Sequence, residues 1–141
     1  MLAMGAVVIV ALVVANFWDI VWLFQSDFQR IQGKWKVVSM AVAGETWPAI
    51  DARYFIFEGE KVLFLDKDGT LEPLNADFRL DEDHQPAWFD IVNTNGNSGQ
   101  GIYEVSRDTL RVLLDARHRD RPTTFESKGD SHAQLLVFER E

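Results

Sequence analysis

The stretch that decides the fold is Ile31-Gln32-Gly33-Lys34-Trp35-Lys36-Val37-Val38, in which a glycine stands two residues before a tryptophan at the start of a β-branched run. It opens a series of short apolar runs that ends at Leu135-Leu136-Val137-Phe138-Glu139-Arg140. Turn-forming Gly, Asp, Asn and Pro residues separate these runs, a pattern typical of antiparallel β-structure. The stretch is therefore expected to be the first strand of a small β-barrel or β-sandwich.

The pattern after residue 33 predicts nine strands. We expect them near residues 34–42, 53–58, 61–66, 70–80, 87–92, 101–106, 109–115, 122–127 and 134–140. Short links at Glu58-Gly59-Glu60, Lys67-Asp68-Gly69 and Arg107-Asp108 are suited to tight hairpins. Eight or nine such strands favour an up-and-down antiparallel barrel, because closure removes exposed edges. A two-sheet sandwich is the alternative.

Composition limits the functions open to this chain. Its 141 residues fit one domain, and a hydrophobic content of 47% is enough for a core. Lys and Arg total 14 against 22 Asp and Glu, a formal net charge of -8, so nucleic acid is not an expected partner. The absence of cysteine excludes disulfides, thiolate nucleophiles and cysteine metal sites.

Residues 1–25 are predicted to be a signal peptide or a single transmembrane anchor helix, and residues 26–141 the barrel domain. Between Leu2 and Phe24 the only strongly polar residues are Asn16 and Asp19. A helix over this segment would be about 35 Å long, enough for a hydrocarbon core of about 30 Å. The tryptophans at positions 18 and 22 would then lie near one interface.

The signal-peptide interpretation has a consequence for the residues that follow it, and a third interpretation also stays open. An apolar region at residues 6–14 could precede cleavage near Ala15, as in a signal peptide. What remains would be an amphipathic helix that closes one end of the barrel, with its apolar face made by Phe17, Ile20, Val21, Phe24, Phe28 and Ile31. A fully buried core helix is the other interpretation, although residues 2–15 are apolar on every face.

The strand motifs resemble a known family. Gly33-Lys34-Trp35 on a first strand and Arg140 on the last resemble lipocalin-like barrels, in which the arginine packs over the indole. Together with Phe78-Arg79-Leu80-Asp81, Gly101-Ile102-Tyr103-Glu104-Val105, Asp108-Thr109-Leu110-Arg111-Val112, Arg121-Pro122-Thr123 and the closing Leu136-Val137-Phe138-Glu139-Arg140, they are similar to an uncharacterised family of lipocalin-like domains known mainly from planctomycete bacteria. The resemblance covers about residues 26–141 and implies a lipocalin-like fold and an exported context, but no catalytic residue.

Location can be argued in two directions. The resemblance and the apolar leader favour a membrane-anchored or exported, extracytoplasmic domain. By contrast, Arg30, Lys34 and Lys36 follow the leader and no basic residue precedes it, which by the positive-inside rule favours the cytoplasm. Three charges are a weak signal, so we expect an extracytoplasmic location.

The polar clusters of the chain are interpreted as loops and turns. The histidines at positions 84, 118 and 132 fall in predicted loops without partners at metal-ligand spacing, and no metal or cofactor is expected. Asp66-Lys67-Asp68-Gly69-Thr70 is read as a hairpin turn and Asp81-Glu82-Asp83-His84 as loop residues. The glycine-rich residues 93–101 are expected to form a loop at the barrel mouth. The three arginines at 117, 119 and 121 could hold an anion at the rim, although a solvated loop is favoured.

The leading functional hypothesis is a non-enzymatic lipocalin-like domain at the membrane or cell envelope. An eight-stranded barrel can be filled with side chains or enclose one small ligand, and the many aromatic residues favour a largely filled interior. A small hydrophobic ligand would be bound by Trp35, Phe57, Phe64, Phe78, Trp88 and Tyr103, while Gly33, Trp35 and Arg140 would be structural. The alternatives are a structural or protein-interaction module with a filled barrel, with the protein partner unknown, and a hydrolase or isomerase with His84 or His118 as base.

Overall fold

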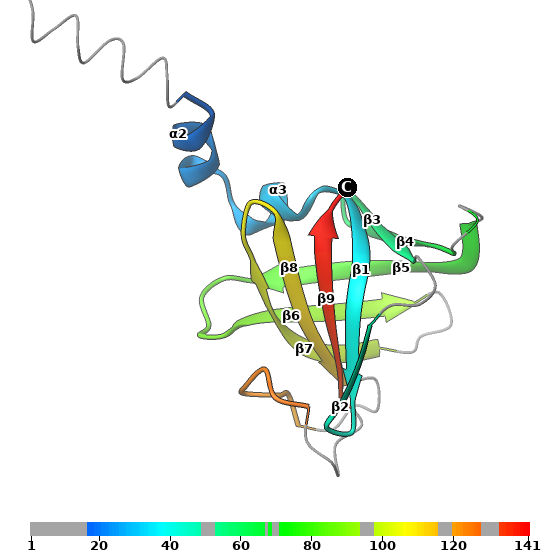
Figure 1. Ribbon diagram of the computed structural model, residues 1–141. Helices are drawn as coiled ribbons and strands as arrows, with labels where there is room; N and C mark the ends of the chain where they lie inside the picture. The colour runs from blue at the N-terminus through cyan, green and yellow to red at the C-terminus, as the bar shows by residue number, and fades with distance from the viewer. Residues whose placement is uncertain are drawn as a thin grey trace, which may run out of the picture.

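The computed structural model describes residues 17–48, 53–66, 68, 71–93, 98–115, 120–127 and 133–141 (Figure 1). Within these residues two short helices precede nine strands: α2 (Phe17–Phe24), α3 (Asp27–Ile31), β1 (Gly33–Val42), β2 (Glu45–Pro48), β3 (Tyr54–Glu58), β4 (Lys61–Leu65), β5 (Leu71–Asp81), β6 (Ala87–Asn93), β7 (Ser98–Val105), β8 (Thr109–Asp115) and β9 (Gln134–Arg140). The apolar leader at residues 2–15 lies outside the described residues.

The strands form one closed antiparallel barrel. Neighbours follow chain order from β3 to β9, and β1 closes the cylinder by pairing with both β3 and β9. The barrel therefore has eight strands, and β2 is an additional strand that forms a hairpin with β1. The predicted all-β up-and-down barrel is confirmed, and the two-sheet sandwich is wrong.

Strand β1 can pair with three partners because its outer edge is divided. Residues Gly33 to Lys36 pair with β3, and residues Ser39 to Val42 pair with β2. On its other edge β1 pairs with β9 along its length, with a register shift between Val37 and Ser39. Such a bulge bends a strand and increases its twist, which suits a strand that must close a barrel.

The apolar pattern over residues 17–31 does not form a continuous helix. Helix α2 ends at Phe24, and Ser26 begins α3 as an N-cap with a complete capping box to Gln29. Arg30 donates hydrogen bonds from Nε and Nη2 to the carbonyl of Trp22, at 3.1 and 2.8 Å, and so satisfies the end of α2. The prediction of one amphipathic helix is wrong because these caps favour two helices, although α3 does cover one barrel end.

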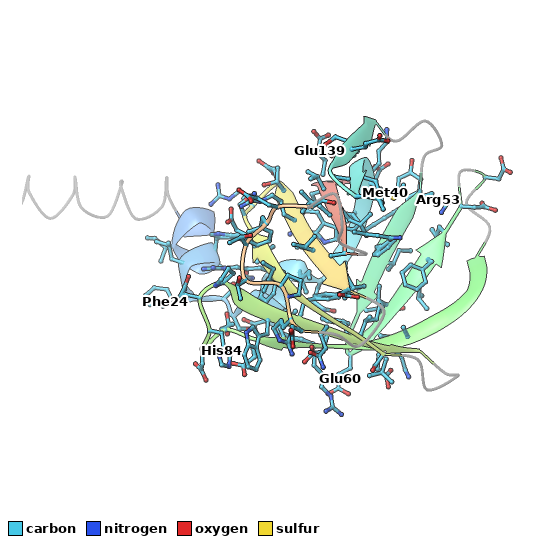
Figure 2. The ribbon with its side chains drawn as sticks, turned by 90° about the horizontal axis from the view of Figure 1, so that it is seen from below. Phe24, Met40, Arg53, Glu60, His84 and Glu139 are labelled. Carbon is cyan, nitrogen blue, oxygen red and sulfur yellow. The ribbon has the colours of Figure 1, made fainter. Side chains whose placement is uncertain are left out.

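The core lies inside the cylinder. Twelve buried residues form one cluster: Ile31, Trp35, Val37, Phe57, Val62, Ala76, Phe78, Phe89, Tyr103, Leu110, Val112 and Phe138. They come from all eight strands of the wall and from α3, and Figure 2 draws the side chains on the ribbon of these elements. We call the barrel end that carries α3 and the chain terminus the α3 end, and the other the far end.

A second, smaller cluster lies on the outer surface. Ile102, Leu113 and Ala133 are buried there, with Trp88, Phe125 and Leu135 packed against them. The cover is supplied by residues 120–127, a segment of bends rather than the strand expected at 122–127. That expectation is wrong: the segment packs its side chains on the wall instead of pairing with it. The other differences are the unpredicted β2 and the start of β7 at Ser98, within the predicted glycine-rich loop.

Candidate functional site

The first and last strands meet at the α3 end through Trp35 and Arg140. The two residues are register partners, and the guanidinium carbon of Arg140 lies 4.2 Å from the centroid of the indole. The indole Nε1 donates a hydrogen bond to the carbonyl of Ile31 at 2.7 Å, which ties α3 to the barrel. The predicted contact between this indole and guanidinium is confirmed.

Arg140 also donates hydrogen bonds to the backbone around it. Its three nitrogens donate to three carbonyls: Nε to Arg107 at 2.9 Å, Nη1 to Gln32 at 3.0 Å and Nη2 to Arg30 at 2.5 Å. Gly33 has a φ of 115°, which L side chains rarely adopt, and a Cβ there would lie 3.4 Å from Arg140 Nη1. The glycine of the Gly-x-Trp motif therefore supplies the backbone turn that brings the helix-to-strand junction beneath the guanidinium. Burial lowers the pKa of Arg140, while Asp108 opposes that change.

Tyr103 makes a second link between α3 and the wall. Its hydroxyl donates a hydrogen bond of 2.7 Å to Asp27 Oδ2 in α3. Burial, and then the interaction with Asp27, raise the pKa of Tyr103 above its ordinary value. Since its hydroxyl is already hydrogen-bonded to Asp27, Tyr103 holds α3 against the wall and does not offer a free polar group to a ligand.

Packing inside the barrel differs between its two ends. Toward the α3 end Trp35, Phe57, Phe78 and Tyr103 are almost completely buried. Phe57 makes edge contacts with Phe78 at 5.0 Å and with Phe89 at 6.3 Å between ring centroids. The α3 half of the interior is therefore filled by side chains.

Toward the far end, inward-facing apolar side chains are only partly buried. Five of them pack against the main core while keeping some exposed surface: Phe55, Phe64, Ile91, Leu114 and Leu136. Met40 is the register partner of Leu136 on the neighbouring strand, so it also lies on the inward face of the wall toward the far end. These six residues define what we call the apolar mouth.

The apolar mouth contains an inward position without a side chain. Gly99 is the register partner of Ile91, and a Cβ added to it would lie 3.1 Å from side-chain atoms of both Ile91 and Leu114. Gly101 is different, because its added Cβ would lie only 2.2 Å from the backbone oxygen of Leu113. Gly99 thus lets the side chains of Ile91 and Leu114 pack against the strand where a methyl group would crowd them, whereas Gly101 allows close approach of two strands.

The structure divides the six residues predicted to bind a ligand. Five face the interior, of which Trp35, Phe57, Phe78 and Tyr103 belong to the packed core and Phe64 to the apolar mouth. Trp88 instead lies on the outer surface, in the small cluster. Trp88 faces outward because it stands one residue before the inward-facing Phe89, and successive side chains of a strand point to opposite faces. Phe55, Leu114 and Leu136 were not singled out, although the same alternation contains them.

Trp88 is the centre of an aromatic and charged group on the outer wall. The ring of His84 is stacked on it with centroids 3.3 Å apart, and the guanidinium carbon of Arg121 lies 4.1 Å from its ring. Two groups at such distances cannot occupy the same face, so the indole is enclosed between them. His84 Nε2 also contacts Asp81 at 3.3 Å. This histidine lies on the outside of the barrel wall.

Arg121 holds residues 120–127 on the wall. Its Nη1 donates a hydrogen bond to the carbonyl of Gly101 and contacts Asp90 Oδ1, each at 2.8 Å. With these partners and Trp88, its guanidinium is engaged within the protein. Arg117 and Arg119, the other two arginines of the cluster for which a solvated loop is favoured over an anion site, lie outside the described residues.

A polar pocket of about 190 Å³ lies beside this segment. Its lining includes Asp115, Asp120, Arg121, Thr124 and Glu126. It is separate from the apolar mouth, whose residues do not line it. In the part of the chain that the structure describes, no group of three histidine, aspartate or glutamate side chains has the arrangement of a metal site.

The remaining sequence motifs have these outcomes. Asp66 Oδ1 accepts a hydrogen bond from the Asp68 amide at 2.9 Å, and Asp81 Oδ1 accepts one from the Asp83 amide at 3.0 Å, both typical of turns. His118, His132 and part of the glycine-rich loop lie outside the described residues. Of the two described helices, neither has the length and apolar character needed to cross a membrane.

The fold and the Trp35–Arg140 contact define a closed β-barrel that is consistent with a lipocalin-like domain. No protein-family model matches the chain. A search of the curated proteins likewise finds no match.

Proposed function

We propose that this chain is a non-enzymatic lipocalin-like domain of the membrane or cell envelope that binds a small hydrophobic ligand in its apolar mouth. The observation that carries the proposal is the difference in packing along the barrel. Toward the α3 end the large aromatic core residues are almost completely buried, and the partly buried inward residues there are the smaller Leu80, Ala87 and Val105. Toward the far end, two aromatic and three aliphatic residues keep some exposed surface: Phe55, Phe64, Ile91, Leu114 and Leu136. Barrels of eight strands have room for at most one small ligand.

The chemistry of the mouth favours an apolar ligand without a charged group. Its six residues have aromatic, aliphatic or thioether side chains, and Tyr103 is already paired with Asp27. Recognition would then depend on shape and on the apolar area removed from water. The ligand would lie above the packed core rather than replace Trp35 or Phe57.

The location is supported by sequence. Residues 2–15 contain no polar side chain, as a signal peptide or membrane anchor requires, and the family that the strand motifs resemble implies an exported context. An extracytoplasmic domain attached to or exported through a membrane fits both.

Binding of N-phenyl-1-naphthylamine, an uncharged fluorescent probe of apolar sites, tests the ligand proposal. We expect saturable binding of one probe per chain with a dissociation constant of about 1–10 μM, a moderate affinity for a shallow apolar site. Leu114→Asn should weaken binding about tenfold or more, because it places an amide in the apolar mouth. Circular dichroism would establish that the variant is folded.

Val92→Asn is the matched control. Val92 is exposed on the outer wall, next to the inward-facing Ile91 on the same strand, so its substitution adds the same amide outside the barrel. The control should bind the probe like the original protein. The proposal is wrong if the probe shows no saturable binding, or if both variants lose it equally.

The second candidate is an interaction module, and a specific observation favours it. The rings of the apolar mouth continue into the packed core, because Phe55 contacts Phe64 on one side and the core residues Phe57 and Phe138 on the other. Phe57 in turn contacts Phe78. A domain without probe binding but with this packing would act through its surface. Native mass spectrometry of protein purified from membranes would separate the two candidates, since a retained lipid-like molecule is expected only of the first.

A further inference from the structure

The largest exposed apolar side chains of the described residues gather at the α3 end. Phe24 is 86% exposed, Leu23 is 71% exposed, and Phe28 of α3 is 39% exposed. In Figure 2 the labelled Phe24 lies on the side of α2 that faces away from the strands. We call these three residues the α2 patch.

The α2 patch has a fixed direction relative to the barrel. Arg30 donates hydrogen bonds to the carbonyls of Trp22 at 2.8 Å and Leu23 at 3.4 Å, and its guanidinium carbon lies 4.9 Å from the Trp22 ring. Arg107, from the turn between β7 and β8, lies 5.9 Å from the same ring. Phe28 stacks on the core residue Phe78 with centroids 5.8 Å apart. An eight-residue helix is not stable alone, so these contacts hold it.

We propose that the α2 patch docks on the surface of a lipid bilayer, so that the α3 end faces the membrane and the apolar mouth faces the water. The apolar residues 2–15 end two residues before α2 begins. If they enter a bilayer, α2 must lie at its surface, where exposed Leu and Phe side chains are stabilised in the interfacial region. This inference deepens the membrane attachment proposed above and is independent of ligand binding.

A lipid surface fits the patch better than a second copy of this chain. The patch has three side chains, whereas a stable protein interface usually buries about 800 Å² on each partner. Arg30 and Arg107, the cations nearest to Trp22, would lie at the depth of lipid phosphate groups. Two guanidiniums thus lie beside the Trp22 ring of the same helix that carries the exposed Leu23 and Phe24.

The absence of cysteine allows a direct test on the full chain. Phe24→Cys and Leu23→Cys would each carry an environment-sensitive fluorophore. Val92→Cys is the apolar control on the barrel wall, and Glu45→Cys, where β2 starts at the far end, is the exposed control. The proteins would be reconstituted into vesicles of phosphatidylcholine with some phosphatidylglycerol. Tryptophan fluorescence would verify that each variant is folded.

We expect the labels at positions 23 and 24 to be quenched by spin-labelled lipid and protected from aqueous iodide about threefold or more relative to positions 45 and 92. If the chain associates with vesicles but all four labels are equally accessible to iodide, attachment stands and docking of the α2 patch is wrong. If the chain does not associate with vesicles, both attachment and docking are wrong. Self-quenching between labels at position 24 that disappears on dilution with unlabelled protein would show a second copy on the patch and also overturn the docking.

Discussion

At the scale of single residues, Trp35 and Arg140 join the two ends of the domain. The indole fills the α3 half of the barrel, its nitrogen binds the end of α3, and the guanidinium covers its face. Each contact depends on the chemistry of these two side chains, since the indole supplies a large apolar body with one donor and arginine supplies a planar fork of donors. Substitutions here should affect the whole fold.

Trp35→Ala is expected to lower the free energy of unfolding by roughly 3–5 kcal/mol, because it empties a completely buried site and leaves the Ile31 carbonyl without its donor. Denaturant melts followed by circular dichroism would measure the change. A loss below about 1 kcal/mol, the range of surface substitutions, would contradict the assigned role.

Arg140→Lys should cost about 2 kcal/mol despite keeping the charge, because one ammonium cannot reproduce the fixed fork that reaches the carbonyls of Arg107, Gln32 and Arg30. The same melts would measure it. Lys61→Arg is a suitable control, since its partner Asp77 is exposed and that pair should contribute little. Equal stabilities of Arg140→Lys and the parent protein would show that charge alone is needed.

At the scale of elements, short segments are placed by side-chain contacts rather than by their own propensity. Helix α3 has five residues, yet it is held by the Ser26 capping box, by Trp35 and by Tyr103. Residues 120–127 are held on the wall by Arg121 and by Phe125, over whose ring Arg111 lies at 4.3 Å. Neither segment would keep its conformation without the barrel beneath it.

Because of the Tyr103–Asp27 contact, the stability of the folded protein is expected to decrease at high pH. The folded pKa of Tyr103 is raised above its unfolded value of about 10, so the folded protein retains the proton that the unfolded chain loses. Stability from this group is complete below pH 10 and falls as the pH rises above it, by up to about 1.4 kcal/mol per pH unit. Urea melts between pH 8 and 11 should therefore show a steeper decline in the parent protein than in Tyr103→Phe. Parallel declines would mean that this phenol is not protected.

At the scale of the whole molecule, closure makes the strands mutually dependent. Strand β1 connects β9 to β3, so each of the eight wall strands pairs with two neighbours. Loss of any one strand would leave the edges of its two neighbours without hydrogen-bond partners. By contrast, α2 touches the barrel mainly through Arg30 and Arg107 around Trp22. Stability should accordingly be distributed unevenly.

Native-state hydrogen exchange measures this distribution. We expect the slowest amides in β1, β8 and β9, with opening energies close to the global free energy, because their hydrogen bonds break only when the cylinder opens. The amides of α2 should exchange through local opening at a much lower energy. Uniform protection over α2 and the barrel would show that the helix is an integral part of the core.

Much of the barrel could be predicted from residue patterns, and the errors of that prediction have physical causes. Alternation located most strands within a few residues, as for Leu110 and Val112, which face the core, although Leu113 on the opposite face of the same strand is buried as well. It failed at residues 122–127, where a mainly polar segment packs Phe125 on the outer wall, and it did not predict the short β2. The candidate site was anticipated as an aromatic interior, but Trp88 was assigned to the wrong face.

The sequence by itself determined the all-β class and the approximate positions of most strands, because these depend on local alternation and turn chemistry, and its resemblance to lipocalin-like barrels implied the contact of Trp35 with Arg140. Only the tertiary structure decided which end of the cylinder is filled, which apolar residues remain partly exposed, and where α2 directs Leu23 and Phe24. Those properties arise where side chains from different strands meet, as Phe57, Phe78 and Phe89 do. A pattern within one short segment of sequence does not indicate which residues of other strands it will contact.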